Sequence, residues 1–454
     1  MSGPKKPSVW RQPDFVKLWS AATVSVMGSQ ITLIAVPFIA LTMLHASAFE
    51  VSLLAAVEML PFLLFTLPAG AWLDRMRRRP VLIAADLGRG VVLLVIPITY
   101  VAGSLALWQL FAVAFVTGTL TAFFDVADQS YLPSLLHRDD LVDGNAKLQV
   151  SYSAAQIAGP TLGGNLLAVV AAPLALIGDA ITFFASGAFL ARIRTREPEP
   201  SKHLDGDGHP TSIWCEIRSG MRYTLGHPLL RPIAGCTATS NLFASGLFAV
   251  WPVLIWNELK LPTYFYGTVM GLASFGFLLG AVLASRMPKR VGLGRTILLS
   301  AFVSTPAFIL MTLTPASLGW AAVTIFAGWF VAGFSQVIYN VAQVSLRQAI
   351  TPLDMQSRMN ATMRFIVWGT IPIGSVLGGM LATDLGVRVA LVGMAAATFL
   401  SFLWVFFSPI RQLRDIPEGP QDDQTAIDGG TATAQTVRPG SGGEMPLGLP
   451  GLDS

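Results

Sequence analysis

Residues 159–166 read GPTLGGNL, and 215 positions further along the chain residues 374–381 read GSVLGGML. The longer stretch 123–166 aligns with 338–381 at the same offset and without a gap. Eleven of the 44 aligned positions are identical, and they cluster at small residues and loop positions. A constant offset that persists through loop residues indicates an internal duplication, so we expect two copies of one structural unit.

The composition indicates that this unit resides in a membrane. Apolar residues make up 53% of the 454 residues and charged residues only 12%, whereas ordinary soluble domains carry about 25% charged residues. The mean hydropathy is +0.60. These values exclude a soluble protein, which would need more polar surface, and they exclude disorder over most of the chain. The two cysteines exclude a disulfide framework. We therefore expect a polytopic membrane protein.

Twelve apolar segments reach the length of about 20 residues that a membrane-spanning helix needs. They are continuous apolar runs rather than alternating ones, which favours helices over the strands of a barrel. The expected spans are residues 15–44, 50–73, 80–101, 105–131, 145–170, 172–193, 229–257, 263–286, 294–314, 317–349, 357–383 and 386–409.

The basic residues give these spans an orientation. Lysine and arginine collect in alternate loops, and only Lys260 and Arg388 fall in the others. Because cytoplasmic loops carry the excess of basic residues, this pattern predicts a multi-pass protein of the cell membrane with both termini in the cytoplasm. The formal net charge of +4 is then a topology signal, and we expect no nucleic-acid partner.

The predicted fold class is an all-α membrane protein, with twelve transmembrane helices in two pseudo-symmetric six-helix bundles. Bundles related in this way are typical of transporters, with the binding site between them near mid-membrane. The expected divisions are a cytoplasmic segment 1–14, a first bundle 15–193, a cytoplasmic linker with an interfacial helix 194–228, a second bundle 229–409 and a disordered cytoplasmic tail 410–454.

The loop after the second span reads GAWLDRMRRR over residues 70–79. A glycine, an aspartate four residues later and a basic run resemble the loop signature of the major facilitator superfamily. Gly70 permits close helix packing, and Asp74 can accept hydrogen bonds from a helix N-terminus and pair with a nearby arginine. The resemblance implies that this loop latches the outward-facing state against the eleventh span. The expected latch residues are Gly70, Asp74, Arg75, Arg78, Arg79 and Arg364. The alternative is a cluster that serves orientation alone.

Over residues 12–410 the order of motifs resembles the branch of this superfamily that holds the enterobactin exporter and the macrolide-efflux-like permeases. In the fifth span, Gly159, Pro160, Gly163 and Gly164 resemble the signature of exporters that exchange substrate for protons, although Ala155 stands where that signature has a further glycine. A flat face of this kind suits a helix that rocks against the eighth span, and simple close packing is the alternative. The resemblance implies proton-coupled export, by alternating access, of a hydrophobic or amphipathic small molecule such as a drug, a siderophore or another natural product.

Ionisable residues inside the expected spans are candidates for proton coupling, because charges in a membrane are costly. They are Glu58, Arg89, Asp125 and Asp128. Arg89 and Asp125 lie at similar depths, so we expect them to form an ion pair. The second copy has Asn340 and Gln343 in place of the two aspartates, so we expect coupling to reside in the first bundle. Structural roles are the alternative for all four residues.

Aromatic side chains on the fourth and tenth spans are candidates for lining an apolar substrate cavity, although helix packing is their commoner use. They are Phe123, Phe124, Phe334 and Tyr339. The five histidines show no metal-ligand spacing, and there is no nucleophile elbow or phosphate-binding loop. We therefore expect no enzymatic activity, no cofactor and no metal. The expected partners are the lipid bilayer, a small-molecule substrate and protons, with the chain a monomer. A non-coupled facilitator, an importer and a transporter-like sensor remain alternatives.

Overall fold

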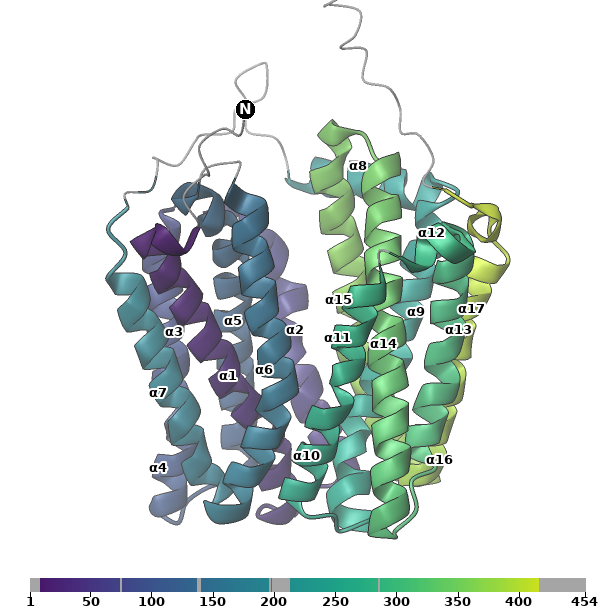
Figure 1. The fold of residues 1–454 in the computed structure, drawn as a ribbon. Coiled ribbons are helices and arrows are strands. Elements are labelled where there is room, and N and C mark those ends of the chain that lie inside the picture. The colour runs from purple at the N-terminus through teal and green to yellow at the C-terminus, as the bar shows by residue number, and fades with distance from the viewer. Residues whose placement is uncertain are drawn as a thin grey trace, which may run out of the picture.

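A computed structural model describes residues 9–73, 76–136, 140–195, 197, 213–284 and 286–415 of the chain. Every regular element in these ranges is helical. Figure 1 shows two bundles of helices side by side, with the first half of the chain in one and the second half in the other. The prediction of an all-α membrane protein is confirmed.

The first bundle begins with a short turn, η1, and continues through seven helices. They are η1 (Val9–Arg11), α1 (Pro13–Thr42), α2 (Ala48–Leu73), α3 (Arg78–Leu93), α4 (Val95–Val101), α5 (Leu107–Leu135), α6 (Leu141–Val169) and α7 (Ala172–Ala191). The helices α3 and α4 follow one another as a single span. Pro97 removes a backbone donor three residues after the junction, which weakens the helix there.

The second bundle contains the remaining helices, several of which are also consecutive halves of one span. They are α8 (Ile213–Gly226), α9 (Leu230–Val253), η3 (Leu254–Glu258), α10 (Thr263–Ala273), α11 (Phe275–Ala284), α12 (Met287–Val291), α13 (Leu293–Thr312), α14 (Leu318–Ile350), α15 (Leu353–Leu385), α16 (Val387–Ala397), α17 (Phe399–Phe406) and η4 (Pro409–Gln412). The short helix α8 packs against α15 and α9, and it lies in the region where the sequence predicts an interfacial helix.

Eleven helical segments of the described chain are long and apolar enough to cross a membrane. The expected fifth span is α6, which has 29 residues but is not among the eleven. Polar residues such as Gln156 and Asn165 lower its hydropathy. Because α6 packs between α1 and α10, much of its surface faces protein, and it needs less apolar surface than a lipid-facing helix.

The helix ends follow the internal repeat. Adding 215 to the last residue of α5, Leu135, gives Ile350, the last residue of α14. The same offset carries α6 onto α15, whose printed bounds, Leu353–Leu385, extend slightly further at both ends. The two copies therefore fold into equivalent helix pairs, one in each bundle.

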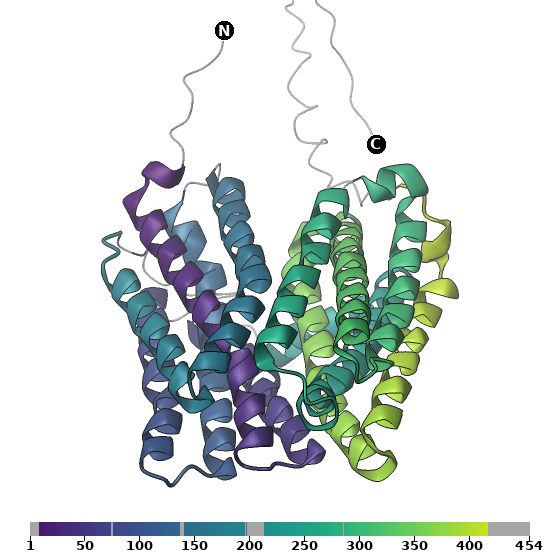
Figure 2. The ribbon, with the colours of Figure 1, turned by 60° about the horizontal axis from the view of Figure 1, so that its bottom comes forward.

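The largest contacts between the two bundles are α6 with α10 and α2 with α15, and smaller ones join α2 to α9 and α1 to η3. We call the end at which α1 begins and α17 finishes the termini end, and the opposite one the far end. Figures 1 and 2 show the bundles diverging toward the termini end. In the eighth span, α10 forms the half nearer the far end and packs on α6, whereas α11 continues toward the termini end and packs on α14 of its own bundle.

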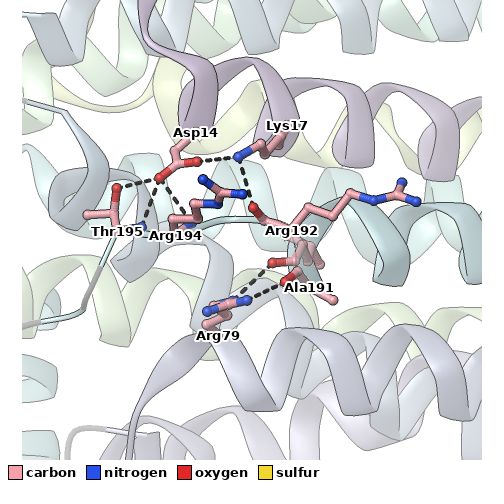
Figure 3. A network of polar contacts seen from close by, with 8 residues as sticks. Asp14, Lys17, Arg79, Ala191, Arg192, Arg194 and Thr195 are labelled. Carbon is pink, nitrogen blue, oxygen red and sulfur yellow. Dashed lines mark hydrogen bonds and ion pairs between the residues drawn. The ribbon is translucent and has the colours of Figure 1, made fainter.

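A polar network joins α1, α3 and α7 at the termini end of the first bundle (Figure 3). Asp14 accepts hydrogen bonds from Lys17 (2.7 Å) and from the backbone amide of Thr195 (2.8 Å). The guanidinium of Arg79 donates to the carbonyl oxygens of Leu190 (3.0 Å) and of Ala191. The first residues of the expected linker, Arg194 and Thr195, are therefore hydrogen-bonded to the bundle although they are exposed.

We expect Asp14→Ala to destabilise the protein. The substitution removes the acceptor of two backbone amides, those of Arg194 and Thr195, and of the Thr195 hydroxyl. It also removes one of the two acceptors of Lys17, which still donates to the Arg192 carbonyl oxygen. Hydrogen bonds to a charged group contribute about 1.5–3 kcal/mol each when buried, and less at a half-exposed site such as this one. The midpoint of thermal unfolding in detergent should fall by several degrees. Asp384→Ala, at an exposed position near the end of α15, is the matched control and should unfold like the unaltered protein. Equal midpoints for the two variants would contradict the role of Asp14.

Candidate functional site

The first contact between the bundles is a seam of small residues between α6 and α10. The Thr161 hydroxyl of α6 donates to the carbonyl oxygen of Gly267 on α10 (3.3 Å). A Cβ atom on Gly267 would lie 2.2 Å from the Pro160 carbonyl oxygen, and one on Gly164 would lie 2.5 Å from the Thr263 carbonyl oxygen. The two backbones are thus as close as glycine permits, and we call this contact the first seam.

The second seam joins α2 to α15 and is equivalent to the first by the internal repeat. Gly379, which is 215 positions after Gly164, faces Ser52 of α2, and a Cβ atom on Gly379 would lie 2.6 Å from the Ser52 Cβ. Nearer the middle of the span, the rings of Phe62 and Trp368 meet edge to face with centroids 5.2 Å apart. The two seams hold the bundles together on both sides of the molecule.

The other glycines of the span-5 motif face their own bundle. Gly159 and Gly163 pack against α1, and their repeat equivalents Gly374 and Gly378 pack against α9. The sequence predicts that the whole motif packs on the eighth span. In the structure Gly164 and the Pro160 carbonyl do so, whereas Gly159 and Gly163 lie on an adjacent face of α6, against the first span.

The expected ion pair of Arg89 with Asp125 does not form between these two described residues. Arg89 instead pairs with Asp86, three residues earlier on α3, where the two side chains share one face. Ser186 of α7 donates to the second carboxylate oxygen of Asp86 (2.6 Å). The paired side chains are only 6% and 0% exposed. Asp86 is on the same helix as Arg89, whereas Asp125 is on the neighbouring helix α5. The nearer carboxylate is the one that binds Arg89.

Two aromatic rings enclose the same guanidinium group. The Cζ atom of Arg89 lies 4.3 Å from the ring centroid of Phe124 and 4.5 Å from that of Phe183. Cation–π contacts of this kind stabilise a desolvated arginine. Arg89 and Phe124 therefore contribute to the packing of the first bundle. This packing role is the alternative that the sequence left open to proton coupling for Arg89 and to cavity lining for Phe124.

Asp125 and Asp128 lie on one face of α5, three residues apart, and both are half-buried. Among the described residues, no side chain or backbone group forms a hydrogen bond or ion pair with either carboxylate. Arg89 of α3 and Arg364 of α15 nevertheless lie near enough to Asp125 for their charges to attract it. Asp125 and Asp128, which carry like charges, lie near enough to repel each other. We call Asp125, Asp128 and Arg364 the charge cluster. It combines groups from both bundles.

Arg364 extends over a ring that belongs to the second seam. Its Cζ atom lies 5.1 Å from the ring centroid of Trp368, one turn further along α15. Trp368 in turn contacts Phe62 of α2. Arg364 is therefore placed where a rotation of one bundle against the other would change its distance from Asp125.

Glu58 lies apart from this cluster. Its backbone carbonyl oxygen lies against Gly118 of α5, and the residue is exposed on α2, four residues before Phe62. Asp125 is seven residues beyond Gly118 on α5, which corresponds to ~10 Å along the helix axis. The structure therefore does not bring Glu58 next to Asp125.

The remaining aromatic candidates differ in their surroundings. Tyr339 is only 9% exposed, and its hydroxyl is hydrogen-bonded to Thr237 of α9 (2.8 Å) inside the second bundle. We expected Tyr339 to line a cavity, but its side chain is buried inside the second bundle and its hydroxyl already has a hydrogen-bond partner in Thr237. Phe123 and Phe334 are half-buried, and Phe123 contacts Phe65 of α2.

The expected latch is described only in part. Asp74 and Arg75 lie outside the described residues. For Gly70 the structure describes only its place in α2. The contacts of these three residues remain a prediction. The backbone amides of Arg78 and Arg79 donate to the carboxylate of Glu197 (2.6 Å each). This carboxylate satisfies the free amides at the start of α3, so the described contacts of the two arginines fasten their own bundle.

Several residues that form these contacts were not predicted from the sequence as functional residues. Gly267 and Gly271 form a glycine pair four residues apart, which is a recognised signal for close helix packing in membranes, and both face α6. Asp86 could have been found as a helical neighbour three residues before Arg89. Glu197 carries no local signal, because it binds a helix that begins 119 positions earlier.

Comparison with known proteins places this architecture in a family. Residues 6–428 match the model of a family described as transmembrane secretion effectors, within the major facilitator superfamily. The chain belongs to this family. The transporter is 25% identical over 430 residues to the multidrug efflux pump Tap of Mycolicibacterium fortuitum, with 90% of this chain and 99% of that protein covered. It is 26% identical over 424 residues to Tap of Mycobacterium tuberculosis, with 91% and 97% covered.

Solved structures show the same fold. A bacterial homologue of the iron transporter ferroportin, in an inward-facing state, superposes with a TM-score of 0.69 at 16% identity and covers 88% of this chain and 99% of that one. A bacterial homologue of the human lysosomal transporter Spinster superposes with a TM-score of 0.67 at 13% identity, covering 89% and 97%. Its family makes the chain a multi-pass membrane transporter and not an enzyme.

Proposed function

We propose that the transporter exports a hydrophobic or amphipathic small molecule across the cell membrane in exchange for protons. The basic residues at the termini end favour a cytoplasmic location for that end and for both termini. The bundles are then closed toward the outside by the two seams and diverge toward the cytoplasm. Alternating access would open the seams and bring the termini ends together.

The charge cluster is the observation that carries the coupling to protons. Asp125 and Asp128 are carboxylates within a span that no described group neutralises by direct contact, and a charge held there is costly unless it is compensated. Arg364 approaches from the opposite bundle. The negative charge of the carboxylates can therefore be compensated in two ways, by a bound proton or by the positive charge of Arg364. Movement of the bundles would change the distance of Arg364 from the carboxylates and so exchange one form of compensation for the other.

Export is supported by the relatives and by the first seam. Two relatives that match nearly the whole chain are named multidrug efflux pumps. The glycine motif that resembles an exporter signature lies with Gly164 and Pro160 at the contact between the bundles, where a movement between closed and open far ends takes place.

Efflux from proteoliposomes under an imposed pH gradient tests this proposal. Fluorescent hydrophobic compounds should move against their own concentration gradients when the pH gradient is present. An uncoupler, which dissipates the pH gradient, should abolish this movement. A facilitator would still equilibrate the compounds after the uncoupler is added, and an importer would move them in the opposite direction. Either result would contradict proton-coupled export.

A further inference from the structure

A groove at the termini end of the second bundle lies outside the transport site described above. It has a volume of about 670 Å³ and runs between the α8–α9 connection and the end of α17. Its apolar lining includes Leu225, Leu400, Leu403, Trp404 and Phe407, and its polar lining includes His227 and Arg231. The groove therefore has an apolar wall and a basic mouth.

The apolar wall is a stripe along the outer face of α17. Leu400, Trp404 and Phe407 follow one another at the spacing of one helical face, over ~10 Å of helix axis. Trp404 is 44% exposed and Phe407 is 78% exposed. The helix α17 packs on α9 and α13, and the exposed part of this stripe faces the surroundings of the bundle, which for a membrane-spanning helix are lipid chains.

Trp404 is held in place by α9. Its ring lies flat against Gly235, where a Cβ atom would come within 2.5 Å of the ring. Its indole N–H donates to the Thr239 hydroxyl (3.1 Å). The ring is thus fixed on one side and open on the other, as expected of the wall of a binding site that exists before its ligand arrives.

The basic mouth consists of one cation and one neutral donor. Arg231 is exposed in the first turn of α9, and no acidic side chain in the described ranges forms an ion pair with it. The Nδ1 atom of His227 accepts hydrogen bonds from the amides of Leu229 (3.2 Å) and Leu230 (3.4 Å). Burial lowers the pKa of His227, so at neutral pH the ring is uncharged and carries its hydrogen on Nε2, from which it can donate.

We propose that this groove binds one anionic glycerophospholipid from the membrane leaflet at the termini end. Arg231 and the Nε2–H group of His227 bind the phosphate, and an acyl chain lies along Leu400, Trp404 and Phe407. A free anion would use the mouth and leave the stripe uncovered. A zwitterionic lipid would bring a second cation next to Arg231. An anionic lipid matches both parts of the groove, and basic pockets beside transmembrane helices are suited to such headgroups.

Fluorescence quenching by brominated lipids tests the proposal, because bromine on an acyl chain quenches a tryptophan that it touches. The chain has 11 tryptophans, so the signal of Trp404 is the difference between the unaltered protein and Trp404→Phe. In detergent micelles, brominated phosphatidylglycerol should quench this signal at about a fivefold lower mole fraction than brominated phosphatidylcholine, the factor equivalent to ~1 kcal/mol for one basic side chain near a membrane surface. Arg231→Gln should remove the preference.

Arg295→Gln is the matched control, because Arg295 is exposed in the first turn of the neighbouring helix α13 and does not line the groove. It should keep the full preference for phosphatidylglycerol. Equal quenching by the two lipids, or a preference that survives Arg231→Gln, would overturn the proposal. Displacement of the brominated lipid by millimolar inorganic phosphate would also overturn it, since the site would then bind a free anion. If Trp404→Phe does not fold, native mass spectrometry of retained phosphatidylglycerol on the unaltered protein and on Arg231→Gln gives the same decision.

Discussion

Replacing Gly267 by alanine should force the far end of the transporter open. The new methyl group would lie 2.2 Å from the Pro160 carbonyl oxygen and 3.0 Å from the Gly164 Cα atom. Both obstacles are backbone atoms, so no side-chain rotation relieves the clash, and α10 must move away from α6. Overpacking typically costs about 1–3 kcal/mol. The closed far end would lose this amount relative to the open one, which shifts their ratio by about 5- to 150-fold.

Spin labels on opposite bundles measure this shift. Ser104 and Ser317 are exposed in far-end connections of the first and second bundle, and cysteines at these positions, in a chain without the two native cysteines, report the separation. Gly267→Ala should lengthen the main distance and should also slow transport, since the carrier cannot close. Gly393→Ala is the matched control, because a Cβ atom there meets nothing within 4 Å. An unchanged distance distribution in folded Gly267→Ala would contradict the role of the first seam.

The internal repeat explains why this part of the fold could be predicted from the sequence. Helix pairs related by 215 positions have equivalent ends, and Gly164 and Gly379 occupy equivalent places in the two seams. Apolar length and the repeat are properties of the chain alone, and they determine which helices exist and how the halves correspond. The glycine pair of α10 was equally visible in the sequence, and its spacing indicates the seam partner of α6.

Partners across helices were predicted less well, and Arg89 shows the reason. Its depth in the membrane is readable from the sequence, because each residue advances a helix by 1.5 Å. The rotation of α3 about its own axis is not readable in this way, and this rotation decides whether the helix face that carries both Asp86 and Arg89 points toward Asp125. Glu197 illustrates the same limit, since it binds the start of α3 from 119 positions further along the chain.

Neutralising the two aspartates of the charge cluster, Asp125 and Asp128, should abolish proton coupling and leave substrate exchange intact. In Asp125→Asn, and more completely in the double variant with Asp128→Asn, the side chains can no longer change charge. Proton-driven efflux from proteoliposomes should fall to the level of protein-free vesicles. Exchange of internal for external substrate without a pH gradient should persist, because asparagine resembles the protonated carboxylate and lets the loaded carrier rock.

Asp179→Asn is the matched control for removing a carboxylate within a span. Asp179 accepts hydrogen bonds from Thr32 and Thr182 inside the first bundle, and both hydroxyls can also bind an amide, so proton-driven efflux should persist. Glu58→Gln locates the coupling group more finely. If it alone abolished proton-driven efflux while the double aspartate variant retained it, coupling would belong to the exposed position on α2. If all of these variants retained it, none of these carboxylates would carry the proton, and the approach of Arg364 to Asp125 would serve only to hold the bundles together.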